Sequence, residues 1–367
     1  MIKILHILTD SNIGGAGHQM LALLNKENGL SRTEFDITVA LPQGAKLLPA
    51  LKEQSINCIE LPYLAENSFS RKAVSILLKE MKCLKPDIVH THAALSGRIA
   101  AKLYGKCKIV YTRHSVFDPT PKQKKFPMRN IIGFVNNFFS HAIIAVSPAA
   151  VDNLIQLGTN PKKITTIFNG MPPAKELDRS ILRQKYNISP DAFVLLQLAR
   201  LTEVKGQNDV LDAAKLLPNA LFLIAGDGEL RPHLEERIKS ENISNVRLLG
   251  FITEVEELLA VMDVQLSASF GTEATSLSLV QGMSIGKPAV VTNYGGNPYV
   301  IQNGENGLIV PTHDPTAIAT AIEKLQTSPK LYRNMTTKAR VIYASKFPVQ
   351  KMVSETTILY RKVLVKS

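Results

Sequence analysis

Residues 264–311 read VQLSASFGTEATSLSLVQGMSIGKPAVVTNYGGNPYVIQNGENGLIVP. This stretch contains three short apolar runs, Val264–Ser267, Ala289–Thr292 and Gly307–Val310, with longer polar or mixed segments between them. Runs of about four to eight apolar, β-branched residues that alternate with helix-length segments are typical of parallel strands buried on both faces. The stretch therefore predicts part of an α/β fold with a doubly wound sheet.

The same alternation extends through almost the whole chain, with further runs at 2–8, 35–41, 87–92, 108–112, 142–146, 193–198, 221–225 and 246–250. A polar stretch after Gly170 separates two series of runs. We predict two Rossmann-like doubly wound domains, an N-terminal one over 1–172 and a C-terminal one over 173–349. Residues 350–367 predict a helix that packs back on the N-terminal domain. Two such sheets imply a ligand cleft at the facing carboxyl ends of their strands.

Composition favours an intracellular globular protein. A length of 367 residues fits two domains, and no apolar run approaches the roughly 18 residues that span a bilayer. The three cysteines, Cys58, Cys83 and Cys107, lie far apart in the sequence, which argues against disulfides and a zinc site. We expect a cytoplasmic protein. Peripheral attachment to the inner face of the cell membrane is compatible with this location.

Positive charge is concentrated in one region. Residues 71–129 hold 14 lysines and arginines against 3 acids, in a chain of net charge +12. Such a region suits phosphates, anionic lipid or nucleic acid. The chain has no tryptophan and no nucleic-acid-binding motif, so we expect no nucleic acid partner. The basic segment Lys122–Arg129 precedes the apolar residues 131–139, and this combination favours binding to an anionic membrane surface. The alternative is a buried helix preceded by a solvated basic segment.

The opening stretch also carries the main candidate ligand site. Glu273 follows a strand, and a helix is predicted to begin at Ser276, Leu277 and Ser278. A helix N-terminus with small residues offers free backbone N–H groups to a phosphate. A carboxylate just before it accepts hydrogen bonds from sugar hydroxyl groups. The pattern indicates a sugar diphosphate.

A second signal comes directly after the strand 193–198. Arg200 and Lys205 lie five residues apart on one loop, where two cations are able to converge on a diphosphate. Stabilising a leaving diphosphate is an electrostatic task that suits such a pair. A solvated surface pair is the alternative.

These two stretches resemble the donor site of the retaining family 4 glycosyltransferases of GT-B fold, in which two acids eight positions apart flank a small apolar segment. The resemblance implies that Glu273 contacts donor-sugar hydroxyls and that Arg200 and Lys205 clamp the donor diphosphate. Gln281 stands where the family has the acid that binds the nucleotide ribose, and it keeps one carbonyl acceptor without the charge. Tyr299 also stands where the family usually has a glutamate.

The resemblance extends to several glycine turns that follow predicted strands. Gly226 resembles the strand-to-helix turn of the nucleotide domain, and Gly250 with Phe251 resembles the place where backbone groups meet the base. Gly14 and Gly15 resemble the loop that faces the donor phosphates. A dinucleotide fingerprint fits poorly there because Met20 fills the third glycine position and no acid ends the second strand. For Gly226, and for Gly250 with Phe251, ordinary turns of an α/β protein are the alternative.

Histidines mark the N-terminal half. His114 follows the strand 108–112 and resembles the family's histidine that reaches the donor sugar, with a structural role as the alternative. His92 and Arg98 resemble the acceptor side. His90 and His92 alternate on one strand face, as in a metal site, but no third ligand with suitable spacing is apparent. The resemblance implies that neither a metal nor another cofactor is needed.

The resulting hypothesis is a hexosyltransferase-type glycosyltransferase of cell-surface polysaccharide or glycolipid synthesis. It would move a sugar from a nucleoside diphosphate sugar, UDP- or GDP-linked, to a hydroxyl of a glycan or lipid-linked acceptor, with retention of configuration. Catalytic roles fall on His114, Glu273, Arg200 and Lys205. Two alternatives remain at this point: a sugar-nucleotide 2-epimerase of the same fold, and a non-catalytic nucleotide-sugar-binding subunit suggested by Gln281 and Tyr299.

Overall fold

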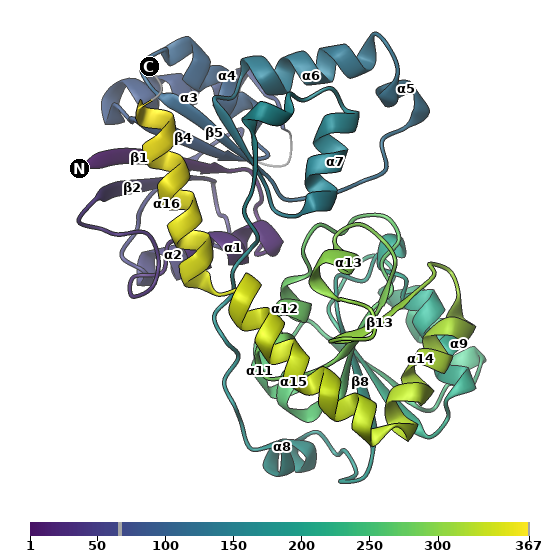
Figure 1. Cartoon of the computed structure of the whole chain (residues 1–367). Coiled ribbons are helices and arrows are strands. Elements are labelled where there is room, and N and C mark those ends of the chain that lie inside the picture. The colour runs from purple at the N-terminus through teal and green to yellow at the C-terminus, as the bar shows by residue number, and fades with distance from the viewer. Residues whose placement is uncertain (65–67, 366–367) are drawn as a thin grey trace. The chain divides into compact units, whose positions relative to one another are not determined.

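The computed structural model describes residues 1–64 and 68–365, and the chain divides into two compact units (Figure 1). The N-terminal unit is Met1–Met171 together with the C-terminal segment from Phe347, and the C-terminal unit is Pro172–Lys346. The domain boundaries expected after residues 172 and 349 lie within three residues of these. Residues 366 and 367 of the expected C-terminal helix lie outside the described part.

The N-terminal unit is built on a parallel sheet of seven strands in the order β3-β2-β1-β4-β5-β6-β7. The strands are β1 Ile2–Leu8, β2 Phe35–Pro42, β3 Asn57–Leu61, β4 Ile88–His92, β5 Lys108–Arg113, β6 Ala142–Ala145 and β7 Ile164–Thr166. The strand order reverses between β1 and β4. Ligands of doubly wound sheets bind outside the carboxyl ends of the strands at such a reversal.

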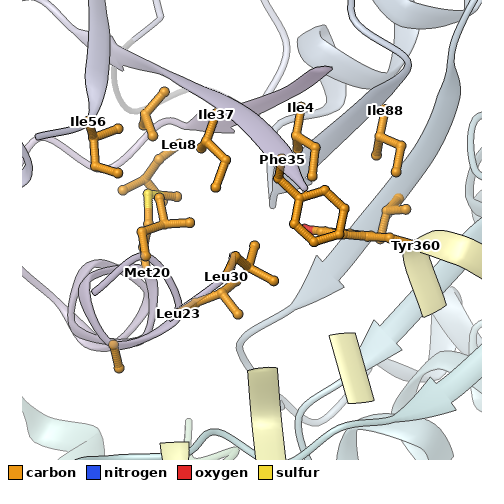
Figure 2. Packing of buried hydrophobic residues seen from close by; sticks show 14 of the residues in the cluster. Ile4, Leu8, Met20, Leu23, Leu30, Phe35, Ile37, Ile56, Ile88 and Tyr360 are labelled. Atoms are coloured by element: carbon orange, nitrogen blue, oxygen red, sulfur yellow. The ribbon is translucent and has the colours of Figure 1, made fainter. Parts of the chain in front are cut away.

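Helices cover both faces of this sheet. The bounds are α1 Gly15–Leu23, α2 Leu48–Glu53, α3 Arg71–Leu84, α4 Leu95–Tyr104, α5 Pro121–Lys124, α6 Met128–Phe138, α7 Pro148–Gln156, the 3₁₀ turn η1 Pro161–Lys163, and α16 Val349–Val365. One buried cluster joins α1, α2 and α16 to the sheet, and another joins α3 and α4 to the opposite face. Figure 2 shows Tyr360 of α16 beside Phe35 of β2, with ring centroids 5.9 Å apart. The last helix is therefore part of the N-terminal core.

The C-terminal unit is built on a second parallel sheet, of six strands in the order β10-β9-β8-β11-β12-β13, which reverses between β8 and β11. Its strands are β8 Phe193–Leu198, β9 Ala220–Ala225, β10 Val246–Gly250, β11 Val264–Ser267, β12 Ala289–Thr292 and β13 Gly307–Val310. Its helices are α8 Arg179–Lys185, the 3₁₀ turn η2 Glu203–Lys205, α9 Gln207–Leu216, α10 Arg231–Ser240, α11 Val255–Val261, α12 Leu277–Ser284, α13 Asn297–Val300, α14 Pro315–Thr327 and α15 Pro329–Lys346.

Several helices begin where the sequence supplies a capping side chain. Ser147 accepts a hydrogen bond from the Ala150 backbone N–H at the start of α7, and Asp314 accepts one from Ala317 at the start of α14. In both helices a proline follows the cap, where its missing N–H costs nothing. These signals fix where the helices begin after the polar turns.

No helix in the described residues is long and apolar enough to cross a membrane.

Candidate active site

The main candidate site lies where the C-terminal sheet reverses direction. β8 and β11 are hydrogen-bonded neighbours, so the loops that follow them emerge side by side at one sheet edge. Lys205 comes from the first loop and Glu273 from the second, and Lys205 Nζ lies 2.8 Å from Glu273 Oε2. The two side chains are only 20% and 11% exposed. A largely shielded ion pair therefore stands at the position where a doubly wound sheet holds its ligand.

The Glu273 loop is held by the Gly295-Gly296 turn. The Gly296 backbone N–H donates to the Glu273 carbonyl oxygen at 2.9 Å. A Cβ atom on Gly296 would lie 1.6 Å from the Ala274 carbonyl oxygen, so only glycine allows this approach. The Tyr294 hydroxyl also donates to the Gly271 carbonyl oxygen at 2.6 Å. These contacts fix the loop that presents the carboxylate.

The ion pair keeps unused hydrogen-bonding capacity. The Lys205 ammonium group donates to the Thr272 carbonyl oxygen and to Glu273 Oε2, both at 2.8 Å. The Ser269 hydroxyl donates to the same Oε2 atom at 3.2 Å. An ammonium group has three N–H donors and a carboxylate two oxygen atoms. One Lys205 N–H and Glu273 Oε1 therefore remain without a partner among the described residues.

Arg200 lies earlier on the loop that carries Lys205. Its side chain is exposed and makes no ion pair within the described part of the chain. Its backbone is fixed, because the Gln207 side-chain amide donates to the Arg200 carbonyl oxygen at 2.9 Å. The structure thus brings Lys205 and Glu273 into contact and leaves the Arg200 guanidinium in solvent.

Helix α12 begins after the Glu273 loop. Ser276 is its N-cap residue, and the Ser276 and Ser278 hydroxyls lie 3.1 Å apart. Ser276, Leu277, Ser278 and Gln281 are all partly exposed. Ser278 and Gln281 are three residues apart and so share a helix face. The helix start and the Gln281 side chain are therefore accessible to a ligand.

The glycine turns of the same unit close the neighbouring strand ends. Gly226 has a φ of +139°, and a Cβ there would lie 1.9 Å from the Ala199 carbonyl oxygen. Its backbone N–H donates to the Gly250 carbonyl oxygen at 2.8 Å, which joins the ends of β9 and β10. Phe251 is exposed, with 72% of its surface accessible. Tyr299 lies on α13 and is partly exposed.

In the N-terminal unit, the glycine loop follows β1 at the reversal of the sheet. Gly14 is the N-cap residue of α1, and Gly15 is its first residue. The loop borders a hollow of about 240 Å³ lined by Thr9, Asp10, Ser11 and Asn12. Sequence reasoning included Asn12 in this loop but missed Thr9, Asp10 and Ser11, although their place directly after the first central strand is a usable signal.

The N-terminal unit also contains a cluster of buried histidines, and here one expectation was wrong. No third ligand was expected beside His90 and His92, but the structure places His6 next to both, with one ring nitrogen from each histidine within 4.8 Å of the others. The reason is topological, because β1 and β4 are parallel neighbours with His6 opposite His90. All six ring nitrogens take part in hydrogen bonds with protein groups. A metal would have to displace those bonds.

His114 lies at the end of this cluster, just after β5. Its Nε2 atom is 2.8 Å from His92 Nδ1. Its Nδ1 atom is shielded from solvent and has no hydrogen-bond partner in the described part of the chain. Burial lowers the pKa of His114 from its ordinary 6.5 to about 4, so the ring is neutral near pH 7. A buried, unpaired ring nitrogen is a place for a ligand group to bond.

Arg98 lies on the other side of the sheet from His92. Its guanidinium stacks over the Tyr111 ring at 4.2 Å and donates to Asn136 Oδ1 at 3.2 Å. Tyr111 precedes Thr112 on β5, and consecutive strand residues point to opposite faces. Thr112 bonds His90, so Arg98 and Tyr111 belong to the opposite face. The two expected acceptor-side residues are not brought together.

The basic segment and the helix after it form an exposed surface, which we call the α6 patch. Its apolar members Phe126, Ile131, Phe134 and Phe138 are 82%, 51%, 59% and 46% exposed. Its basic members Lys122, Lys124, Lys125 and Arg129 are exposed as well. The apolar face of α6 is therefore accessible, which removes the alternative of a buried helix.

Each half of the chain matches a known protein family. Residues 13–175 match the family described as Glycosyltransferase Family 4, and residues 178–341 match Glycosyl transferases group 1. The chain is 31% identical over 289 residues to the N-acetyl-alpha-D-glucosaminyl L-malate synthase of Bacillus anthracis, covering 76% of this chain and 75% of that one. It is 27% identical over 384 residues to the UDP-Gal:alpha-D-GlcNAc-diphosphoundecaprenol alpha-1,3-galactosyltransferase of Escherichia coli, covering 99% and 98%.

A solved structure of similar fold is Anabaena HepE in complex with UDP and glucose. Its TM-score is 0.86 at 21% identity, and the match covers 98% of this chain and 100% of that one. The two Rossmann-like units agree with that fold, which is GT-B. Together with the sequence matches, these observations show that the chain belongs to glycosyltransferase family 4 and is a glycosyltransferase of the hexosyl-transferring type.

Proposed function

We propose that this enzyme transfers a hexosyl group from a UDP-sugar to a hydroxyl group of a lipid-linked or glycan acceptor, with retention of anomeric configuration. The observation that carries the proposal is the Lys205–Glu273 pair at the reversal of the C-terminal sheet. It sets a cation for a diphosphate beside a carboxylate for a sugar. In a nucleoside diphosphate sugar the diphosphate is bonded directly to the sugar, so the two groups lie side by side as the cation and the carboxylate do.

The hydrogen-bonding groups that the Lys205–Glu273 pair leaves unused define the role of each residue. The remaining Lys205 N–H donates to a phosphate oxygen, and the exposed Arg200 guanidinium supplies a second cation to the diphosphate. Glu273 Oε1 accepts from a sugar hydroxyl. Gln281, on the accessible face of α12, accepts from the nucleotide ribose. In the N-terminal unit, His114 keeps an unpaired ring nitrogen as a candidate bonding group for a sugar hydroxyl.

The reaction needs no covalent enzyme intermediate. The bond between the anomeric carbon and the diphosphate oxygen breaks, and the acceptor oxygen forms its bond to that carbon on the same face. The acceptor proton passes to the departing phosphate. The main work of the protein is to stabilise negative charge that grows on the diphosphate, which falls to Lys205 and Arg200.

The relatives support the choice of nucleotide and acceptor. The Escherichia coli relative uses UDP-Gal and a diphosphoundecaprenol-linked acceptor, according to its name, and HepE was solved with UDP and glucose. The α6 patch combines exposed aromatic side chains with lysines, a composition that binds anionic membrane surfaces. A peripheral contact through this patch would bring the enzyme to a lipid-linked acceptor.

The test measures UDP release from UDP-glucose, UDP-galactose and UDP-N-acetylglucosamine, with and without bacterial membrane extract. Acceptor-dependent release is expected with one of them. Lys205→Ala should lower kcat by roughly 100-fold, the scale of losing one donor to a developing oxyanion. Lys185→Ala is the matched control, because it removes an ion pair with Glu257 elsewhere in the same unit and should leave kcat unchanged.

Three other results would each contradict part of the proposal. Formation of an epimeric UDP-sugar without acceptor would indicate the epimerase alternative. Product of inverted anomeric configuration, read from its NMR coupling constants, would exclude retention. Equal activity of Lys205→Ala and Lys185→Ala would remove Lys205 from the site.

A further inference from the structure

Three side chains of the N-terminal unit place two positive charges around one aromatic ring. We call them the arginine cluster: Arg98 of α4, Tyr111 of β5, and Arg113, the last residue of β5. The Arg98 guanidinium lies over the Tyr111 ring, 4.2 Å from its centroid, and Arg113 Nη1 donates to the Tyr111 hydroxyl at 3.4 Å. Tyr111 and Arg113 alternate with Thr112 along the strand, so both point to one face of the sheet.

No carboxylate of the described residues balances these two charges. Asp118, soon after Arg113 in the sequence, and Asp152 of α7 are both exposed and pair with neither arginine. Burial lowers the pKa of Arg98 below its ordinary value; Tyr111 acts against this shift, and the positive charge of Arg113 adds to it. An arginine keeps its charge at neutral pH even so. The cluster therefore holds two neighbouring cations without a counter-charge.

Most of the hydrogen-bond donors of the cluster are unused. Arg98 donates once, from Nη1 to Asn136 Oδ1 at 3.2 Å. Besides its bond to Tyr111, Arg113 donates from Nη2 to Asn153 Oδ1 at 3.0 Å. The Nε atoms of both arginines are shielded from solvent and have no acceptor in the described part of the chain. Because a guanidinium has five N–H donors, each arginine keeps several without a partner.

Arg183 of α8 shows how this protein satisfies a buried arginine elsewhere. Arg183 is 4% exposed and Arg98 is 5% exposed. The three nitrogen atoms of Arg183 donate to three backbone carbonyl groups, and Nη2 also donates to Asp263 Oδ2 at 2.9 Å. Buried charges are normally paired in this way, because an unpaired one loses its hydration without compensation. Arg98 has a single neutral acceptor at the same burial, so its surroundings lack an anion.

A phosphoryl group has the charge and the acceptors that the cluster lacks. It carries about −1.5 to −2 charges at pH 7 and has three strong acceptor oxygens. It would balance both arginines, whereas a single carboxylate would balance only one of them. The Tyr111 O–H, which has no acceptor among the described residues, supplies a further donor. Arg113 and Phe117, whose ring centroid lies 4.6 Å from the Arg113 guanidinium, are partly exposed, so a solute is able to approach from the carboxyl end of β5.

We propose that Arg98, Tyr111 and Arg113 form a binding site for a phosphoryl group. All three residues lie in the N-terminal unit, so the site does not depend on the proposed reaction. Two sources of the group share this chemistry, a phosphate carried by the acceptor substrate and free inorganic phosphate that acts as an effector. Only the role of the site in transfer rests on the proposed function.

The first experiment locates inorganic phosphate on the full-length protein in the absence of UDP-sugar. The Nε–H signals of Arg98 and Arg113 are followed in ¹H–¹⁵N spectra, and each is assigned by its loss in Arg98→Lys or Arg113→Lys. Both signals should move as phosphate replaces chloride at constant ionic strength, because a charged acceptor arrives beside them. The Nε–H of Arg183, which donates to the Val261 carbonyl oxygen at 3.3 Å, is the internal control and should not move.

Two variants of the same unit test the contribution of charge. Arg113→Gln removes a partly exposed guanidinium from the cluster and should weaken phosphate binding by roughly tenfold, read from the Arg98 signal. Arg129→Gln removes an exposed guanidinium outside the cluster and should bind phosphate like the wild type. Unmoved Arg98 and Arg113 signals in the wild type, or equal phosphate affinity of the two variants, would overturn the inference.

The second experiment identifies the source of the group and uses the UDP-sugar that gives acceptor-dependent UDP release. If the acceptor carries the phosphate, inorganic phosphate should compete with it, and Arg113→Gln should raise the acceptor KM by roughly tenfold with the donor KM unchanged. If free phosphate is an effector, it should change kcat in the wild type but not in Arg113→Gln, with the acceptor KM unchanged in both.

The remaining outcomes separate this site from the proposed function. Phosphate that raises only the KM of the UDP-sugar, equally in the wild type and in Arg113→Gln, would bind at Lys205 and count against the arginine cluster. Arg98 and Arg113 signals that respond to phosphate in a protein without transfer activity would support the site and refute the proposed function. Transfer activity in a protein whose two signals ignore phosphate would do the reverse.

Discussion

Gln281 offers the sharpest prediction at the scale of single residues. Its side chain lies on the accessible face of α12, in the position that the family resemblance gives to the ribose-binding acid. Gln281→Glu supplies a charged acceptor with two oxygens for the two ribose hydroxyls, and charge-assisted hydrogen bonds are the stronger ones. We expect UDP to bind roughly three- to tenfold more tightly, measured by isothermal titration calorimetry.

The control for this prediction is Gln184→Glu. Gln184 is exposed on α8 of the same unit, so this variant adds the same charge away from the site. It should leave the UDP affinity unchanged. An unaltered or weaker affinity in Gln281→Glu would show that Gln281 does not face the ribose.

At this scale the sequence was informative where a residue follows a central strand. Lys205 and Glu273 both follow predicted strands, and the family resemblance implied that they hold one ligand; the structure places their charged groups 2.8 Å apart. His6 was missed because its neighbours in space, His90 and His92, are more than 80 residues away in the sequence. Nothing local marks a histidine in an apolar strand as part of a cluster. The signal is the pairing of β1 with β4, which is a property of the sheet.

Helix α6 gives a prediction at the scale of one element. Phe134 is 59% exposed within the α6 patch, and the lysines before the helix add attraction to anionic lipid. Phe134→Asp should lower binding to vesicles that contain anionic phospholipid by roughly tenfold, measured by sedimentation. Ile181→Asp alters a similarly exposed residue of α8, 62% accessible, and should bind like the wild type. Equal binding by both variants would exclude α6 as the contact.

Helix α16 gives a second prediction at the scale of one element, because two adjacent residues serve as variant and control. Leu359 is 5% exposed in the core of the N-terminal unit, and Ile358 beside it is 60% exposed. Leu359→Ala should lower the free energy of unfolding of that unit by about 2–5 kcal/mol, because it removes buried apolar atoms and leaves a cavity. Ile358→Ala should change it by less than about 0.5 kcal/mol. Urea unfolding monitored by circular dichroism measures both, and similar losses would contradict the packing of α16.

In the N-terminal sheet the central strands were predictable and the two edge strands were not. The runs at 2–8 and 193–198 match β1 and β8, because strands covered on both faces must be apolar throughout. β3 (Asn57–Leu61) and β7 (Ile164–Thr166) lie at the two edges of the N-terminal sheet and were not among the expected strands. Their residues are largely partly exposed or exposed, so they carry a weaker apolar signal. The physical reason is that these two short edge strands bury little of their surface.

At the scale of the whole molecule, the chain leaves the N-terminal unit after Met171 and returns to it at Phe347. The repeated alternation of strands and helices predicted two domains, and the polar stretch after Gly170 predicted where the first one ends. The packing of α16 on the first sheet was expected, but an amphipathic helix fits the face of any domain, so its sequence alone does not specify the partner. It depends on the core that residues from Ile4 to Val363 build together.

Four histidines whose pKa values are lowered by burial, His6, His90, His92 and His114, lie in the N-terminal unit, which predicts a different response of the two units to acid. The pKa of His6 is lowered by burial, and further by Arg32, from 6.5 to about 3. Between these values the unfolded chain binds a proton at His6 that the folded chain does not bind. The free energy of unfolding therefore falls as the pH falls, by up to about 1.4 kcal/mol per pH unit for this residue.

Thermal unfolding from pH 7.5 down to pH 4.5 should accordingly lower the melting temperature of the N-terminal unit steeply below about pH 6.5. The carboxylates of any folded protein also make its melting temperature depend on pH. The informative quantity is therefore the difference in melting temperature between the wild type and a variant. His6→Asn removes one titrating group, and its melting temperature should depend less on pH than that of the wild type. The two curves should approach each other as the pH falls, even though the variant is less stable at pH 7.5. Parallel curves would mean that His6 takes up its proton in the folded state as readily as in the unfolded chain.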